Sequence, residues 1–275
     1  MSSYVFILCP PYCGSTLLWK LVSTSSAVSP LPCEGQFIPE VKEIMRQDPW
    51  NPDVKLPWKE IKEVWDGYWD QDKPLLVEKS PPHIIRTSEI VEYFSPDYFL
   101  LMVRNPYAQC EGLIRRGNWN AQKAAELAVG CLRQQAENAA KLNNILCLTY
   151  EELVWNPELI SQKIQTFIPQ IGVLKHAQSF KVHSIDGDVE RGIVDLNKKK
   201  INNLSLNDLK QINEVFKRNA DVLDYWGYKY YEPSLFHAFA FLRTRSGLLL
   251  SATSSKIKRG AARLLRKSNR VCDGY

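Results

Sequence analysis

The loop between Cys9 and Thr16 carries the residues whose types and spacing most clearly suggest chemistry. In VFILCPPYCGSTLLWKL an apolar run stops at two prolines, passes Gly14, and continues as a helix-like stretch that opens with Ser15 and Thr16. A strand, a tight turn and a helix start offer unpaired backbone N–H groups and the positive end of a helix dipole to an anion. The pattern predicts an anion site, and the alternative is an ordinary strand–helix turn that Ser15 caps.

This loop departs from the usual nucleotide-binding sequence G-x-x-x-x-G-K-[ST]. Gly14 and Thr16 are in register with that sequence. Cys9, however, stands where the first glycine belongs, and Ser15 stands where the lysine belongs. The missing lysine argues against an ATP or GTP hydrolase.

Apolar runs elsewhere in the chain indicate which elements position this loop. They predict buried strands at 5–9, 75–79, 98–104 and 144–150. Helical patterns lie at 15–25, 82–94, 121–142, 158–167 and 205–223, with further helix after residue 104. Strands this apolar are buried on both faces, which indicates an α/β fold with a mostly parallel central sheet flanked by helices. Ligands of such sheets bind at the carboxyl ends of the strands, so we expect the 9–16 loop, Lys79 and Arg104 to meet at one edge.

Four segments occur in the order and spacing of a known enzyme family. They are PYCGSTLL, EKSPPHIIR, LLMVRNPYAQCEGLIRR and LCLTYEELVWNPE. Together they resemble the motifs of sulfotransferases that use 3′-phosphoadenosine 5′-phosphosulfate (PAPS), closest to the glycan, protein-tyrosine and bacterial branches. The resemblance covers about residues 4–230. It implies a P-loop-type three-layer sandwich over residues 1–232, PAPS as donor, 3′,5′-bisphosphoadenosine (PAP) as product, and no metal.

The resemblance assigns the sulfate and 5′-phosphate of the donor to the loop residues Tyr12, Cys13, Gly14, Ser15 and Thr16. Relatives usually carry Lys or Arg at the position of Tyr12, whose phenol can donate a hydrogen bond but brings no positive charge. We expect Lys79 to replace that cation, because it ends the strand beside the loop and the resemblance gives this lysine a transition-state role. The alternative is a surface lysine at a strand end.

Glu34, in PLPCEGQ, is the candidate base that accepts the proton of the acceptor hydroxyl. Several branches of the family use a Gly-Glu pair after the first helix, whereas this chain has the order Glu34-Gly35. The alternative is that Glu34 starts a helix over 37–45. His83 is a second candidate base, with capping or packing as its alternative.

The 3′-phosphate of the donor is expected to bind Arg104, because a guanidinium grips phosphate oxygens with two parallel hydrogen bonds. Relatives carry serine at the position of Gly112, a departure for which Arg115 and Arg116 could compensate. The segment ERGIVDLNKKKINN lies where the family has its last donor-binding loop, so Arg191 and Lys198 are further candidates. A solvated basic loop is the alternative there.

The sequence is less specific about the acceptor than about the donor. Aromatic residues between 36 and 73 predict a surface that stacks on sugars or holds apolar groups, while some of them belong to the core. We therefore expect sulfuryl transfer to a hydroxyl of a glycan, a lipid or a small molecule. The alternatives are a sulfotransferase-like protein that binds nucleotide without turnover, and a P-loop small-molecule kinase.

Composition adds expectations about partners and location. The chain has 275 residues, seven cysteines in no zinc-binding pattern, and no apolar run long enough to span a bilayer. We therefore expect a cytoplasmic protein with mostly reduced thiols and no metal site. Residues 233–275 hold nine Lys or Arg and one Asp, and Ile257, Ala261, Leu264 and Leu265 recur at helical spacing. This predicts a basic helical extension for an anionic membrane surface or a polyanion, with a solvated tail as the alternative.

Two further expectations concern binding partners. No recognised nucleic-acid-binding module is present, so sequence-specific readout of nucleic acid is not expected. The apolar segment LFHAFAFL packs either on the body of the protein or on a second copy, which makes a homodimer one option.

Overall fold

The structure is a computed structural model that describes residues 2–185, 187–234 and 236–248. Within these residues five parallel strands form a central sheet in the order β2-β3-β1-β4-β5. The strands are β1 (Ser3–Leu8), β2 (Val28–Pro30), β3 (Leu75–Glu78), β4 (Tyr98–Val103) and β5 (Ile145–Thr149). The expected α/β class and parallel sheet are confirmed. The edge strand β2 was not expected, because its three residues are too few to form a periodic pattern.

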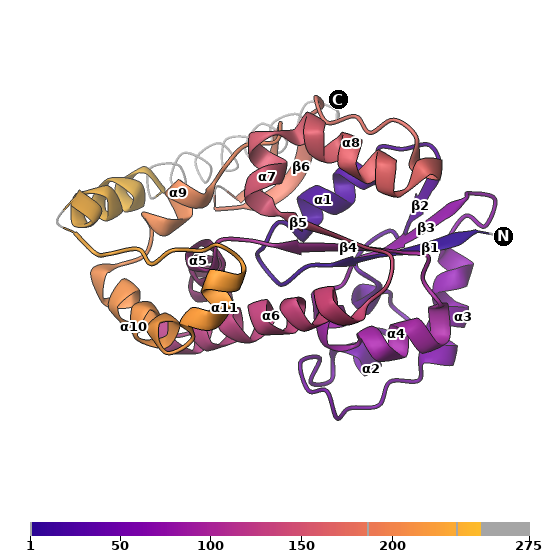
Figure 1. Ribbon diagram of the computed structural model, residues 1–275, viewed down its shortest axis with the longest axis horizontal. Helices are drawn as coiled ribbons and strands as arrows, with labels where there is room; N and C mark the ends of the chain where they lie inside the picture. The colour runs from indigo at the N-terminus through magenta and orange to yellow at the C-terminus, as the bar shows by residue number, and fades with distance from the viewer. Residues whose placement is uncertain (1, 186, 235, 249–275) are drawn as a thin grey trace, which may run out of the picture.

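Helices cover both faces of this sheet (Figure 1). One face carries α1 (Ser15–Val22), α7 (Tyr150–Trp155) and α8 (Pro157–Phe167). The other face carries α3 (Trp58–Tyr68), α4 (Thr87–Phe94) and α6 (Ala121–Lys141). Side chains alternate along β1, so that Val5 and Ile7 enter one core while Phe6 and Leu8 enter the other. The expected three-layer arrangement is therefore confirmed.

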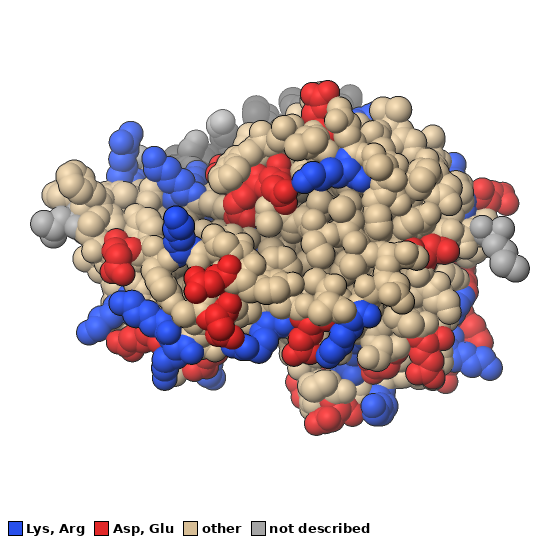
Figure 2. Space-filling view, in the orientation of Figure 1, with Lys and Arg blue, Asp and Glu red and all other residues tan. Residues whose placement is uncertain are grey.

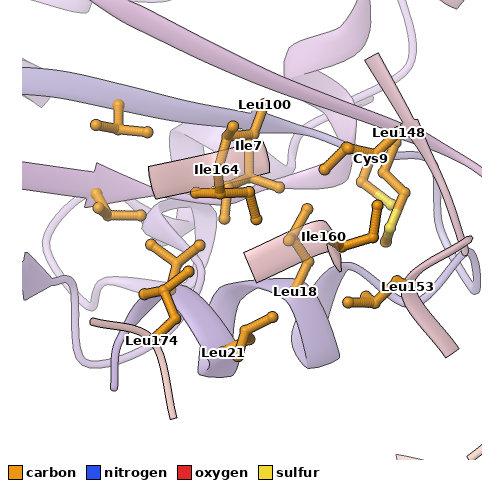
Figure 3. Close-up of a cluster of buried hydrophobic side chains, with 14 of the residues drawn as sticks. Ile7, Cys9, Leu18, Leu21, Leu100, Leu148, Leu153, Ile160, Ile164 and Leu174 are labelled. Carbon is orange, nitrogen blue, oxygen red and sulfur yellow. The ribbon is translucent and has the colours of Figure 1, made fainter. Parts of the chain in front are cut away.

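The core on the α1 face holds the 9–16 loop against the sheet. Figure 3 shows Ile7, Leu100 and Leu148 from three strands packed against residues of the covering helices, which include Leu18, Leu21, Ile160 and Ile164. Full burial of one such side chain is worth roughly 1.5–3 kcal/mol. The start of α1 is consequently fixed next to the carboxyl ends of β1, β3 and β4.

A second group of helices extends the molecule beyond β4 and β5. It consists of α5 (Pro106–Gly117), α9 (Asn197–Ile201), α10 (Leu206–Lys217) and α11 (Ala220–Tyr225). Helices α5, α10 and α11 pack against α6, and α9 packs against α5. Tyr107 and Phe216 meet edge to face at the centre of this core, with ring centroids 4.9 Å apart. This packing brings polar residues of α5 and α9 to the edge of the sheet where the loop lies.

Two of the expected helices are interrupted. The stretch 82–94 is a 3-10 turn, η2 (Pro81–Ile85), followed by α4, and the break falls at Arg86. The Arg86 guanidinium donates to the carbonyls of Asn51 and Val54, both at 2.6 Å, so this residue serves a loop rather than a continuous helix. The stretch 205–223 divides into α10 and α11 at Asn219, whose side-chain amide donates to the Val215 carbonyl at 2.9 Å.

Other short elements were not expected from the sequence. An antiparallel hairpin, β6 (Phe180–Ser184) and β7 (Gly187–Arg191), lies against α1 through β6. The alternative of a helix over 37–45 is wrong, since a 3-10 turn, η1 (Gly35–Phe37), precedes a short α2 (Lys42–Arg46). One more turn, η3 (Pro169–Ile171), follows α8.

The C-terminal part is described only in part. Residues 236–248 are helical, and the basic segment 256–270 lies outside the described residues. No helix within the described ranges combines the length and the apolar character needed to cross a bilayer. The cysteines at 9, 13, 33, 110, 131 and 147 are free thiols.

Candidate anion-binding and transfer site

A pocket of about 550 Å³ opens at the carboxyl edge of the central sheet. Its walls include the loop residues Tyr12, Gly14, Ser15 and Thr16, then Glu34, and on the far side Arg104, Arg191 and Lys200. The expectation that the loop and the residues at the strand ends meet at one edge is therefore met by the geometry.

Gly14 gives the loop its shape. Its φ of 96° lies in the left-handed region, and a Cβ at this position would come within 2.6 Å of the Tyr150 ring. Glycine is therefore required on both counts. The first helical bonds are donated by Leu17 and Leu18 to the Gly14 carbonyl, which leaves the N–H groups before them at the open end of α1. This end forms part of the pocket wall.

Cys13 contributes differently from its neighbours. Its side chain is buried in the core on the α1 face and is absent from the pocket wall. Burial raises the pKa of the Cys13 thiol well above its usual value, so the side chain acts as a small apolar group. Its backbone N–H donates to the Pro10 carbonyl at 3.3 Å, so it helps to close the turn of the loop.

Lys79 joins the loop to the candidate base. Its ammonium lies 2.5 Å from Glu34 Oε1 and 3.4 Å from Thr16 Oγ1. Both partners line the pocket, and the lysine lies directly behind them, almost fully buried. A cation, a carboxylate and a loop hydroxyl are thus in mutual contact although they are far apart in the sequence.

Glu78 fixes the backbone that carries Glu34. Its Oε1 accepts hydrogen bonds from the Gly35 N–H at 2.8 Å and from the Ser80 hydroxyl at 2.6 Å. Burial alone would raise the pKa of Glu78, but the His83 imidazole and these two donors hold it below its usual value. A Cβ on Gly35 would lie 2.3 Å from the Trp65 ring, so only glycine fits between the strand end and α3.

His83 does not line the pocket. It is buried, its Nε2 lies 2.7 Å from Glu78 Oε2, and its ring packs against Phe6, Trp58 and Trp65. With no access to the pocket, this imidazole cannot take a proton from an acceptor. We therefore leave His83 out of the proposed chemistry and assign it the orientation of Glu78.

Three contacts hold the Arg104 guanidinium in place beside the pocket. Only 4% of its surface is exposed. Its Nε donates to Asn197 Oδ1 at 2.7 Å, its Nη1 donates to the Tyr12 carbonyl at 3.2 Å, and its guanidinium stacks on the Tyr150 ring at 3.7 Å. Its Nη2 is buried and has no hydrogen-bond partner among the residues that the structure describes. A buried cationic donor without an acceptor is costly, and an anion in the pocket would satisfy it.

Tyr12 and Gly112 form one steric unit. Tyr12 has a φ of 62°, and a Cβ on Gly112 would lie 2.6 Å from both Cβ and Cγ of Tyr12. The two departures from the resembled motifs are therefore linked, because a serine at 112 cannot coexist with this path of the loop. Gly112 makes room for Tyr12 and is not itself part of the pocket wall.

Lys200 is the lysine of α9 that reaches the pocket. Its Nζ lies 3.0 Å from both the Ala108 carbonyl and Glu111 Oε2, and 5.9 Å from the centre of the Tyr12 ring. Burial, and after it the nearby Arg104 guanidinium, lower the pKa of Lys200 to about 8. Lys198, the residue expected from the sequence, is exposed and does not line the pocket. Only packing against α5 distinguishes the two lysines.

Comparison with known proteins gives a match in structure only. No family model and no curated protein matches the sequence. Sulfotransferase STF9 from Mycobacterium avium superposes with a TM-score of 0.51 and 11% identity, over 83% of this chain and 78% of that one. This chain has the sulfotransferase fold.

Two further solved structures superpose less well. Mouse SULT7A1 complexed with PAP has a TM-score of 0.46 and 12% identity, over 80% of this chain and 85% of that one. The sulfotransferase domain from the curacin biosynthetic pathway has a TM-score of 0.47 and 16% identity, over 80% of this chain and 98% of that one.

The other half of the pocket in this sulfotransferase fold is apolar and aromatic. Phe37, Trp50, Pro81 and Pro82 line it, and the Arg46 guanidinium stacks 4.6 Å above the Phe37 ring. Trp58, Trp65 and Trp69 are instead buried in the core beside β3, and Tyr68 is exposed with its hydroxyl on Glu40. The expected division of these aromatics between pocket and core is therefore found, with Trp50 at the pocket.

Sequence reasoning missed Tyr150 as well as Lys200. Tyr150 supplies the ring under Arg104 and the wall against Gly14. Tyr150 belongs to the Y-E-E-L segment, which indicates the family resemblance but does not by itself indicate a role in the pocket. Among the residues that the structure describes, no group of three or more His, Cys, Asp or Glu side chains could hold a metal ion. A metal-free reaction stays a prediction.

Proposed function

We propose that this chain transfers a sulfuryl group from PAPS to a hydroxyl group of a glycan, lipid or small-molecule acceptor. The observation that carries the proposal is the buried Arg104, which lines the same pocket as the start of α1 and whose Nη2 has no hydrogen-bond partner within the described ranges. Two anion-binding features at one pocket suit a donor with phosphate groups at both ends of its ribose. The sulfotransferase fold agrees with this assignment but does not by itself define the activity.

In this arrangement each charged group of PAPS has its own set of binding residues. The amides of Gly14, Ser15 and Thr16 hold the 5′-phosphosulfate at the positive end of α1. Arg104 holds the 3′-phosphate through Nη2, and Lys200 adds positive charge beside it. Arg191 lines the same part of the pocket and serves the same phosphate.

The transfer step uses Lys79 and Glu34. The acceptor oxygen attacks sulfur in line, the bond from sulfur to the bridging phosphate oxygen breaks, and PAP leaves. Glu34 accepts the proton of the acceptor hydroxyl, and Lys79 offsets the charge that grows on the departing oxygen. The contact between Lys79 and Glu34 holds both side chains in place, and the lysine exchanges this contact for the departing oxygen during transfer.

The acceptor binds over the apolar half of the pocket. Phe37 and Trp50 offer ring faces, and the neighbouring Arg46 favours acceptors that carry an acidic group near the reacting hydroxyl. An acceptor library should therefore pair each glycan, lipid and phenol or alcohol with its acidic analogue.

The test separates this proposal from its two rivals. PAP should raise the melting temperature of the protein more than ATP does, whereas a kinase would show the reverse. Labelled PAPS with the acceptor library should then yield labelled product. Binding of PAP without transfer to any acceptor would favour a nucleotide-binding protein without turnover, which the uncharged Tyr12 in the loop also favours.

Replacing Lys79 tests the chemistry within the proposal. The Lys79→Ala variant should lose about 10²–10³-fold in turnover because one well-placed charge on the departing oxygen is removed. Its affinity for PAP should change little. Lys198→Ala, an exposed lysine outside the pocket, is the matched control. Normal turnover in Lys79→Ala would show that the assigned role is wrong.

A further inference from the structure

The start of the helix formed by residues 236–248 is fixed to the body of the protein. His237, near its start, is buried, with Nε2 2.8 Å from the Leu204 carbonyl and Nδ1 3.2 Å from the Tyr231 hydroxyl. Its ring also packs on Tyr231, with centroids 5.2 Å apart. These contacts set which side of the helix faces away from the protein.

The outward side of this helix is apolar. Phe236, Phe239 and Leu242 are 87%, 73% and 61% exposed, and their spacing of three residues places them on one face. Arg243 lies next to this row and is exposed, while Arg245 lies 5.4 Å from the Phe241 ring. Three large apolar side chains in a row exceed the scattered exposure that is ordinary at a protein surface.

The sequence of this helix and of the residues beside it along the chain carries charge of a single sign. From residue 233 to residue 272 the sequence contains nine Lys or Arg and no Asp or Glu. Figure 2 shows Lys and Arg side chains along the upper left edge, where α9 and this helix lie in Figure 1. The preceding acidic residue, Glu232, lies 4.0 Å from Lys217. The partner of this face therefore carries negative charge.

We propose that the exposed face of the 236–248 helix binds the surface of a bilayer that contains anionic lipids. Apolar side chains flanked by arginines on one helical face suit the boundary between lipid headgroups and acyl chains. A second copy of the chain would bring like charges together, and a nucleic acid would leave the phenylalanines in water. The inference does not depend on the proposed transferase activity.

Co-sedimentation of the full chain with vesicles tests this surface. The protein should bind vesicles of equal parts phosphatidylcholine and phosphatidylglycerol, and bind phosphatidylcholine alone weakly. Added salt should weaken binding because it screens the charges. The variant Phe236→Ser/Phe239→Ser/Leu242→Ser should bind the anionic vesicles about tenfold more weakly or worse, because the apolar area that inserts is lost.

The control replaces exposed apolar residues elsewhere. Trp155 and Val173 are 71% and 78% exposed, so Trp155→Ser/Val173→Ser removes comparable surface and should leave vesicle binding unchanged. The same melting temperature in both variants shows that folding is intact. The proposal is overturned if neutral and anionic vesicles bind equally, or if the triple variant binds like the original chain. It is also overturned if the full chain is a dimer that the triple variant dissociates and vesicles do not bind.

Discussion

Tyr12 shows how two unusual residues can have a single cause. The loop follows a left-handed backbone at Tyr12, and the atoms of this side chain occupy the space that any side chain at 112 would need. The Tyr12 carbonyl also accepts a hydrogen bond from Arg104 Nη1. A side chain added at Gly112 should therefore displace Tyr12 and, with it, disturb Arg104 at the candidate phosphate site.

The Gly112→Ser variant should unfold more easily by roughly 1–3 kcal/mol and bind PAP more weakly, because the new side chain displaces Tyr12. Adding Tyr12→Gly removes the clashing atoms and suits the positive φ, so the double variant should regain part of the lost stability. Chemical denaturation and PAP titration measure both effects. Gly130→Ser is the control, since nothing lies within 4 Å of a Cβ there. Equal losses at 112 and 130 would contradict the steric account.

Lys200 should make PAP binding depend on pH. Its pKa is lowered to about 8, so the side chain is mostly charged at pH 7 and loses its proton as the pH rises through about 8. If its charge supports the phosphate, PAP affinity is constant near pH 7 and falls above about 8. PAP titrations across this pH range measure the fall in affinity. Lys200→Gln should abolish this pH dependence, and Lys198→Gln should keep it. If Lys200→Gln kept the pH dependence, another group would be responsible for it.

At the scale of elements, the carboxyl ends of β1, β3 and β4 position the residues of the candidate site. The parallel register aligns Phe6 with Glu78 and with Phe99, so the residues after each strand emerge at one edge. The carboxylate of Glu78 then holds the Gly35 backbone, and through it Glu34. The position of the candidate base thus depends on a buried hydrogen-bond network rather than on a helix.

The Gly35→Ala variant tests that dependence. Its Cβ would lie 2.3 Å from the Trp65 ring and 2.8 Å from Glu78 Oε1, so the turn must shift and Glu34 must move with it. We expect turnover to fall about tenfold or more and stability to fall by about 1–3 kcal/mol, while PAP affinity holds. Gly67→Ala in α3 meets nothing within 4 Å and should gain about 0.5–1 kcal/mol. Unchanged turnover in Gly35→Ala would remove Glu34 from the mechanism.

At the scale of the whole molecule, the body and the C-terminal segment differ in charge and in packing. The body through Tyr231 is tied to the core, since the Tyr231 N–H donates to the Tyr107 hydroxyl at 3.0 Å and its carbonyl accepts from Asn213 at 3.1 Å. Beyond it, Glu232 lies 4.0 Å from Lys217, and His237 Nε2 lies 2.8 Å from the Leu204 carbonyl. A domain over residues 1–232 with a basic extension over 233–275 stays a prediction.

A chain shortened to residues 1–232 tests the boundary. It should still unfold in one cooperative transition and bind PAP like the full chain, because the pocket walls lie within it. Loss of the His237 contacts should cost roughly 1–3 kcal/mol, or about 2–4 °C of melting temperature for each kcal/mol. Calorimetry and PAP titration measure these quantities. Loss of the cooperative transition would place the boundary further along the chain.

The sequence by itself determined the sheet and the place of the loop. Long apolar runs form parallel strands wherever they are buried, so their carboxyl ends, with Gly14, Lys79 and Arg104, could be predicted to lie at one edge. It also determined the strongly basic character of the C-terminal segment, since charge is a property of composition.

Only the tertiary structure decided which polar residues share the pocket. Lys200 lies inside and Lys198 outside because α9 packs on α5 in one orientation, and His83 turns inward because Glu78 binds it. The Tyr12–Gly112 contact joins two segments about a hundred residues apart. Such contacts depend on long-range packing, which local periodicity does not encode.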